Sequence, residues 1–122
     1  MSNRTDLAAL LRTELPIARF DVKDTADLPD AIAKATVVLR MGEFVPAPNA
    51  RGSWWATFHV IVASHHKDRT RAEDAIEEDL PTVCEALDKK AGLMIRRATP
   101  VMVKDAYFGF EIEAVFPMPA PY

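Results

Sequence analysis

The residues from Gly52 to Ser64 (G-S-W-W-A-T-F-H-V-I-V-A-S) constrain the fold more than any other part of the chain. They hold both tryptophans and the densest run of β-branched and aromatic residues, which favour a pleated, half-buried backbone. Alternate side chains of a strand point to opposite faces of its sheet. One face would be wholly apolar: Trp54, Ala56, Phe58, Val60 and Val62. The other would be mixed: Trp55, Thr57, His59, Ile61 and Ala63. We predict the central strand of an antiparallel sheet, with helices over the apolar face.

Three further segments predict strands. Thr36 to Val45 is rich in β-branched residues, and Leu93 to Lys104 and Tyr107 to Phe116 are separated by a short turn, which predicts a hairpin. Residues Ile17 to Val22 alternate more weakly and suit an edge strand. In the last strand the alternation predicts that five residues face the core: Phe108, Phe110, Ile112, Ala114 and Phe116. It predicts that five others face outward: Tyr107, Gly109, Glu111, Glu113 and Val115.

Two segments carry the apolar spacing of helices. The first has leucines at positions 7, 10, 11 and 15, a capping residue at Ser2 or Asn3, and Pro16 as its end. The second opens with Thr70 and Glu73, spaced as in a capping box. Its apolar stripe is Ala72, Ile76, Leu80, Val83 and Leu87. Pro81 lies inside this pattern and predicts a kink or two helices in tandem. The fold class that follows is α+β: a mostly antiparallel sheet of four to five strands packed by two main helices, in one domain of 122 residues.

Two proline-rich segments are predicted to leave this fold. Residues 46–52 are too long for a tight hairpin and contain two prolines, so we expect the loop Phe44 to Gly52 to project as a mobile arm. An inert hairpin tip is the alternative. The predicted protein contact residues are Phe44, Val45, Pro46, Pro48, Arg51 and Trp55. The end of the chain, Pro117 to Tyr122, is predicted to be an extended tail because three alternating prolines disfavour helix and strand.

The composition excludes several classes of function. The net charge is −3, from 18 acidic and 15 basic residues, so no positive field favours sequence-independent DNA binding. No apolar run approaches the roughly 20 residues of a membrane-spanning helix, and the N-terminus does not resemble a signal peptide. We therefore expect a soluble protein without a membrane partner. The single cysteine, Cys84, fits a reducing compartment and is predicted to be a packed thiol.

The residue types that usually carry chemistry do not form a recognisable site. Of the three histidines, we expect His59 to be partly buried and hydrogen-bonded within the sheet. His65 and His66 are adjacent at a strand end and should point in opposite directions. The chain has no zinc spacing, phosphate-binding glycine loop or nucleophile motif. We predict that the protein is not an enzyme and holds no metal or cofactor.

The order of the elements and several short sequence words are similar to the tail terminator (tail completion) proteins of long-tailed bacteriophages, which are minor tail proteins of siphophages. The residues that carry the resemblance are Leu7 to Leu15 with Phe20-Asp21-Val22, T-V-V-L-R from Thr36, A-R-G-S-W-W from Ala50, D-A-I-E-E-D-L-P-T-V-C-E-A-L from Asp74, and Y-F-G-F-E-I-E-A-V-F from Tyr107. The resemblance covers nearly the whole chain and includes no catalytic signature.

The resemblance implies a structural virion protein. Its subunits would form a hexameric ring at the head-proximal end of the tail tube, end tube polymerisation and provide the surface for head–tail joining. The implied partners are further copies of the chain, the tail tube protein and a neck or head-completion protein, with DNA passing through the lumen without specific binding. The protein would be made in the host cytoplasm and reside in the virion tail. Two alternatives stay open: a neck or head-completion protein, and a small α+β ligand-binding or enzymatic dimer.

Overall fold

The computed structural model describes residues 3–23, 28–29, 31–47 and 52–119 of the chain. The elements in chain order are α1 (Asn3–Glu14), β1 (Phe20–Val22), β2 (Ala35–Pro46), β3 (Ser53–Ala63), α2 (Arg69–Leu87), β4 (Met94–Val103) and β5 (Tyr107–Pro119). The five strands form one sheet in the order β1-β2-β3-β5-β4, in which β1 is parallel to β2 and every other pair is antiparallel. This confirms the predicted α+β class and the central place of β3.

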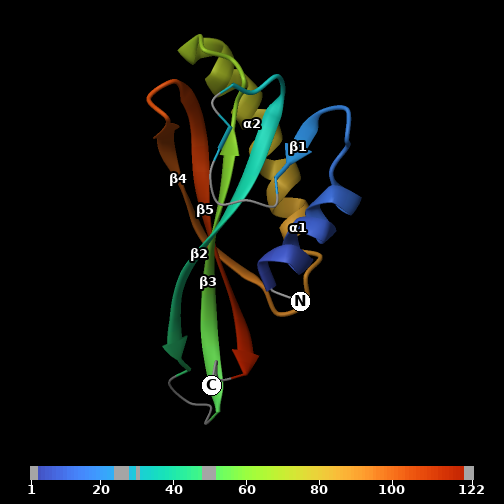
Figure 1. Ribbon diagram of the computed structural model, residues 1–122, viewed down its shortest axis with the longest axis vertical. Helices are drawn as coiled ribbons and strands as arrows, with labels where there is room; N and C mark the ends of the chain where they lie inside the picture. The colour runs from blue at the N-terminus through green and yellow to red at the C-terminus, as the bar shows by residue number, and fades with distance from the viewer. Residues whose placement is uncertain (1–2, 24–27, 30, 48–51, 120–122) are drawn as a thin grey trace.

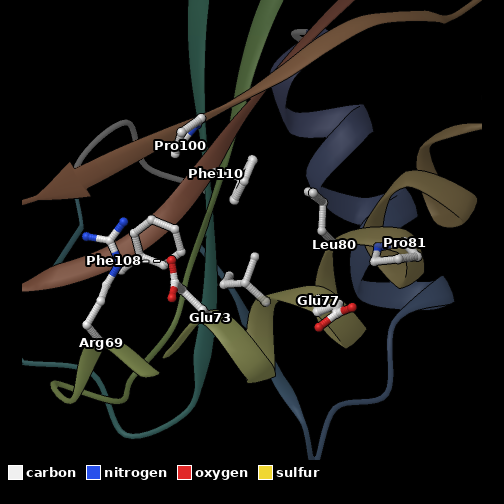
Figure 2. Close-up of a pocket in the computed structure, with 9 residues that line it drawn as sticks. Arg69, Glu73, Glu77, Leu80, Pro81, Pro100, Phe108 and Phe110 are labelled. Carbon is white, nitrogen blue, oxygen red and sulfur yellow. Dashed lines mark ion pairs between the residues drawn. The ribbon is translucent and has the colours of Figure 1, made fainter. Parts of the chain in front are cut away.

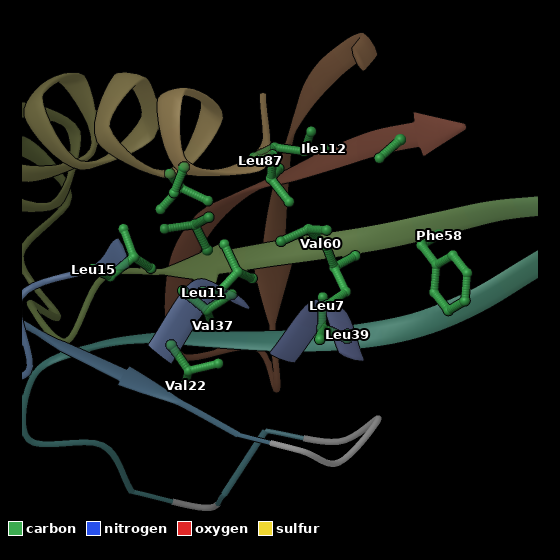
Figure 3. Close-up of a cluster of buried hydrophobic side chains, with 14 of the residues drawn as sticks. Leu7, Leu11, Leu15, Val22, Val37, Leu39, Phe58, Val60, Leu87 and Ile112 are labelled. Carbon is green, nitrogen blue, oxygen red and sulfur yellow. The ribbon is translucent and has the colours of Figure 1, made fainter. Parts of the chain in front are cut away.

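Both helices lie on the same face of the sheet (Figure 1). The predicted apolar face of β3 supplies the centre of the core: Ala56, Phe58, Val60 and Val62 are all buried. Leucines 7, 11 and 15 of α1 and the following turn pack onto it, as Figure 3 shows. The ring of Phe58 stacks on that of Phe116 with 5.5 Å between centroids. Burying a side chain of this size contributes about 2–3 kcal/mol, so this face of β3 explains why both helices dock where they do.

The opposite face of the sheet is covered only in part. A second buried cluster lies there: Leu28, Val38, Ile61, Ala63, Val103 and Tyr107. Tyr107 belongs to this cluster and is 3% exposed, and Val115, outside the cluster, is 2% exposed, so the prediction that these two residues face outward is wrong. Alternation along a strand assigns a side chain to a face but does not say whether another segment covers that face. Here the segment that carries Leu28 and Ile32 packs over one end of it.

The start of α2 differs from the predicted capping box. The helix begins at Arg69, and the side chain of Asp68 caps it by accepting a hydrogen bond from the backbone N–H of Arg71. The Thr70 cap is thus wrong by two residues. Pro81 lies inside one continuous helix, so the alternative of two tandem helices is also wrong. Pro81 removes only one backbone hydrogen bond of the helix. The helix continues past it because buried residues on both sides of Pro81 pack into the same core.

The edge strand β1 is shorter than predicted. It starts at Phe20 and pairs with β2 over only three residues, whereas Ile17 lies in a turn before it. This turn is closed by the carbonyl oxygen of Pro16, which accepts hydrogen bonds from the N–H groups of Arg19 and Phe20, each at 3.0 Å. The proline that ends α1 therefore also fixes the geometry of the turn that follows.

The prolines at positions 46, 117 and 119 lie within strands and do not end them. Val45 pairs with Trp55 and Pro46 with Trp54, while Trp55 also faces Pro117 across β5. The predicted arm from Phe44 and tail from Pro117 are thus wrong at these positions. The pairing of β1 with β2 stops at Val37, and that of β4 with β5 stops at Val115, so these prolines lie on edges. An edge strand tolerates proline because its outward N–H needs no partner. The predicted mobility of residues 48–51 lies outside the described residues.

Candidate functional site

The strands β2, β3 and β5 extend past the helical layer and form the lower extremity of the molecule in Figure 1. We call residues 44–46, 53–56 and 116–119 the three-stranded end. At its tip the strand register places the side chains in two cross-strand rows, one on each face. The row on the helical face is Pro46, Trp54 and Met118. The row on the other face is Val45, Trp55 and Pro117. All six side chains are apolar or aromatic, and none is buried.

This end brings together four of the residues predicted to contact a partner: Phe44, Val45, Pro46 and Trp55. Phe44 pairs with Ala56 and packs against the main core, so it supports the end and is not a free anchor. Trp55 lies between Val45 and Pro117 and is half-buried. The other two predicted contact residues, Pro48 and Arg51, lie outside the described residues. The described residues of the predicted contact set therefore lie on paired strands and not on a loop.

A belt of charged residues crosses the face of the sheet that the helices do not cover. His59 Nδ1 lies 2.7 Å from Glu111 Oε1, and Arg97 Nε donates to Glu113 Oε2 at 3.0 Å. The carboxylate oxygen lies off the direction of the imidazole N–H, so the first pair is a close polar contact and not an in-line hydrogen bond. A hollow of about 310 Å³ opens beside the four side chains.

The position of His59 argues against a catalytic role for this hollow. Its other ring nitrogen, Nε2, lies against β2: a Cβ added to Gly42 would be only 2.9 Å from it. A general base needs a nitrogen within hydrogen-bond reach of the reacting proton. One nitrogen of His59 meets Glu111 and the other meets the backbone of a neighbouring strand, so the side chain links β2 to β5. The predicted partial burial of His59 is confirmed, but among the described residues its Nδ1 has no hydrogen-bond partner, so the predicted hydrogen bond is not found at this nitrogen.

The two adjacent histidines differ from the prediction. The rings of His65 and His66 lie 4.1 Å apart between centroids, inclined at 35°, so they do not point in opposite directions. The strand ends at Ala63, and its alternation no longer applies to the residues after it. Across the part of the chain that the structure describes, no group of three or more histidine, cysteine or carboxylate side chains could hold a metal ion.

Cys84 on α2 is half-buried and packs against the main core. Burial raises the pKa of its thiol above the ordinary value of 9.0, and the nearby Asp88 carboxylate raises it further. A thiol is nucleophilic only as the thiolate, which both effects disfavour. The structure thus places Cys84 as the packed thiol that the sequence predicted.

An apolar groove of about 490 Å³ lies between the first half of α2 and the β4–β5 hairpin (Figure 2). Its floor includes Leu80, Phe108 and Phe110, and the two phenylalanine rings meet edge to face at 5.8 Å. The guanidinium of Arg69 lies over the ring of Phe108 at 4.0 Å and forms an ion pair with Glu73 at 3.4 Å. The sequence predicted that these phenylalanines face the core. Only the packing of α2 against the hairpin shows that the surface between the helix and the hairpin is open.

Comparison with known proteins gives no family for the chain: no protein-family model matches it, and no curated protein matches it. Within the described residues, no helix is both long and apolar enough to span a membrane.

Proposed function

We propose that the protein is a structural assembly subunit whose three-stranded end binds a protein partner. The observation that carries this proposal is the pair of cross-strand rows at the tip, which leaves both tryptophans only partly buried at one extremity of the molecule. Tryptophan is enriched among the residues that dominate binding energy at protein interfaces. Paired strands hold these side chains in fixed positions, so little conformational entropy is lost when a partner covers them.

The specific assembly that we propose is the tail of a long-tailed bacteriophage. Following the resemblance to tail terminator proteins, the chain would form a ring that caps the head-proximal end of the tail tube, stops its polymerisation and presents a surface for head–tail joining. The net charge of −3 supports this role, because an acidic subunit does not hold the phosphate backbone of DNA that must slide through the lumen. The proposed partners are the tail tube protein and a neck or head-completion protein.

Two other functions remain in competition. A neck or head-completion protein would expose a similar surface, and it differs in binding the portal side in place of the tube protein. A small ligand-binding dimer is favoured by one observation, the apolar groove of about 490 Å³ with its convergent charged rim. A small molecule copurifying in stoichiometric amount with the protein would support that reading.

The test compares Trp55→Ala with Met94→Ala, a change at a side chain that is 54% exposed and lies outside the three-stranded end. Tail tubes are assembled with each purified variant and measured by negative-stain electron microscopy. We expect the wild type and Met94→Ala to cap tubes at a uniform length, and Trp55→Ala to give overlong tubes while its circular dichroism spectrum stays native. Overlong tubes with the wild type as well would refute the terminator role, and uniform tubes with Trp55→Ala would refute the role of the three-stranded end.

A further inference from the structure

Ile17 is the most exposed of the large hydrophobic side chains in the described part of the chain, at 83%. The turn that carries it is held on both sides. Arg19 Nη2 lies 2.6 Å from Asp79 Oδ1 of α2, and Lys34 Nζ donates to the carbonyl oxygen of Ile17 at 2.6 Å. The result is an isoleucine presented to solvent in a fixed position with an ammonium group beside it. We call Ile17 and Lys34 the basic corner.

The groove beside α2 has the complementary chemistry. Its floor is apolar, and the two glutamates that line it, Glu73 and Glu77, are both exposed. Arg69 also lines the groove and pairs with Glu73, so these three charged side chains give the rim one net negative charge. Figure 2 shows both glutamates on the α2 side of the groove, with the ion pair between Glu73 and Arg69 drawn as a dashed line. An isoleucine side chain that enters the groove would leave water, and a lysine at its side would face the two carboxylates. Opposite charges around an apolar contact fix the orientation of the contact and disfavour other partners.

The basic corner cannot reach the groove of its own chain. Along α2 the helical period places Asp79 on one flank of the buried stripe and Glu73 and Glu77 on the other. The ion pair of Arg19 with Asp79 therefore holds the corner on the side of α2 that faces away from the groove. Figure 1 agrees: the turn between α1 and β1 and the β4 strand lie on opposite sides of the molecule. The two surfaces can meet only between two molecules.

We propose that Ile17 of one copy enters the groove between α2 and the β4–β5 hairpin of a second copy, with Lys34 facing Glu73 and Glu77. The two contacting surfaces differ, so the contact is head-to-tail and generates a closed ring or an open chain. This inference rests on the proposed function and deepens it, because it names the contact between ring subunits. It leaves the three-stranded end free to bind a different protein.

The test measures self-association of the purified full chain by sedimentation velocity over a range of concentrations. We expect Ile17→Ala to raise the dissociation constant about 10- to 100-fold, as the loss of one buried aliphatic side chain implies. Lys34→Glu and Glu77→Lys should each weaken association about tenfold, and the double variant should restore it, because the charges are exchanged across the same contact. Met94→Ala, at an exposed side chain away from both surfaces, is the matched control.

The outcomes separate this inference from the proposed function. If the wild type associates but Ile17→Ala associates equally well, or if the charge exchange does not restore binding, the proposed contact is wrong and the assembly role stands. If the wild type remains a monomer at every concentration, alone and beside the tail tube protein, both are wrong. Loss of tube capping by Trp55→Ala with unchanged self-association would show that the two surfaces serve different partners, as we infer.

Discussion

The ion pair between Arg19 and Asp79 predicts that its two partners contribute unequally to stability. Both Nε and Nη2 of Arg19 donate to the same oxygen of Asp79, at 2.9 and 2.6 Å. The Asp79 side chain is only 9% exposed, whereas that of Arg19 is 40% exposed. Water can therefore solvate the guanidinium when the carboxylate is removed, but it cannot solvate the carboxylate when the guanidinium is removed.

Arg19→Met keeps an unbranched stem but leaves the Asp79 charge buried without this partner, which costs about 3 kcal/mol. The contact of the guanidinium with the Phe20 ring, 5.1 Å from its centroid, is lost as well and adds about 0.5 kcal/mol. Asp79→Asn keeps the side-chain volume and an oxygen that can still accept. We expect it to cost about 1 kcal/mol, in the range of one ordinary hydrogen bond.

The assay is urea unfolding near neutral pH, followed by circular dichroism at several protein concentrations so that self-association does not enter the free energy of unfolding. In the double variant Arg19→Met/Asp79→Asn the buried group is neutral, so the total cost should be lower than the sum of the single costs by about 2 kcal/mol. An Asp79→Asn variant that loses as much stability as Arg19→Met would refute the reasoning, since it would mean that exposure does not decide the cost.

Three further predictions concern the sheet and α2. Gly109→Ala should lower the free energy of unfolding by about 3 kcal/mol or more, as measured by thermal unfolding. The reason is that the added Cβ would clash with the backbone carbonyl of Val62 on the neighbouring strand. Phe58→Ala should cost about 3–5 kcal/mol in the same assay, since this side chain is 1% exposed in the main core. At about pH 8, Cys84 should react with iodoacetamide more slowly in the folded than in the urea-unfolded protein, because burial and Asp88 raise its pKa and leave less thiolate. Equal rates in the two states would contradict this.

The elements of this fold follow from local sequence patterns, and their surroundings do not. The period of two in β3 and β5 and the helical spacing in α2 identified the faces that form the main core. Whether the second face is covered depends on a distant segment, so the burial of Tyr107 could not be predicted from its own strand. The prolines at 46 and 117 were predicted to end strands because the sequence does not show which part of a strand lacks a neighbour.

The candidate site was predicted in part. Phe44, Val45, Pro46 and Trp55 were among the predicted contact residues, and the structure brings these four to one end of the sheet, all on strands. The groove and the basic corner could not be predicted, since each depends on how α2 packs against segments far away in sequence. Ile17 was assigned to the edge strand, and only the fold shows that it lies in a turn with its side chain in water.

The edges of the sheet bear on how copies of this protein can associate. An open edge strand could pair with a neighbour through its backbone, but both edges here carry features that proteins use to prevent such pairing. On β4 these are Pro100 and an irregularity between Ile95 and Arg97. On β2, beyond its short pairing with β1, they are an irregularity between Met41 and Phe44 and a proline at position 46. Backbone pairing is thus disfavoured along β4 and along the part of β2 that β1 does not cover, which favours association through side-chain surfaces such as the groove and the three-stranded end.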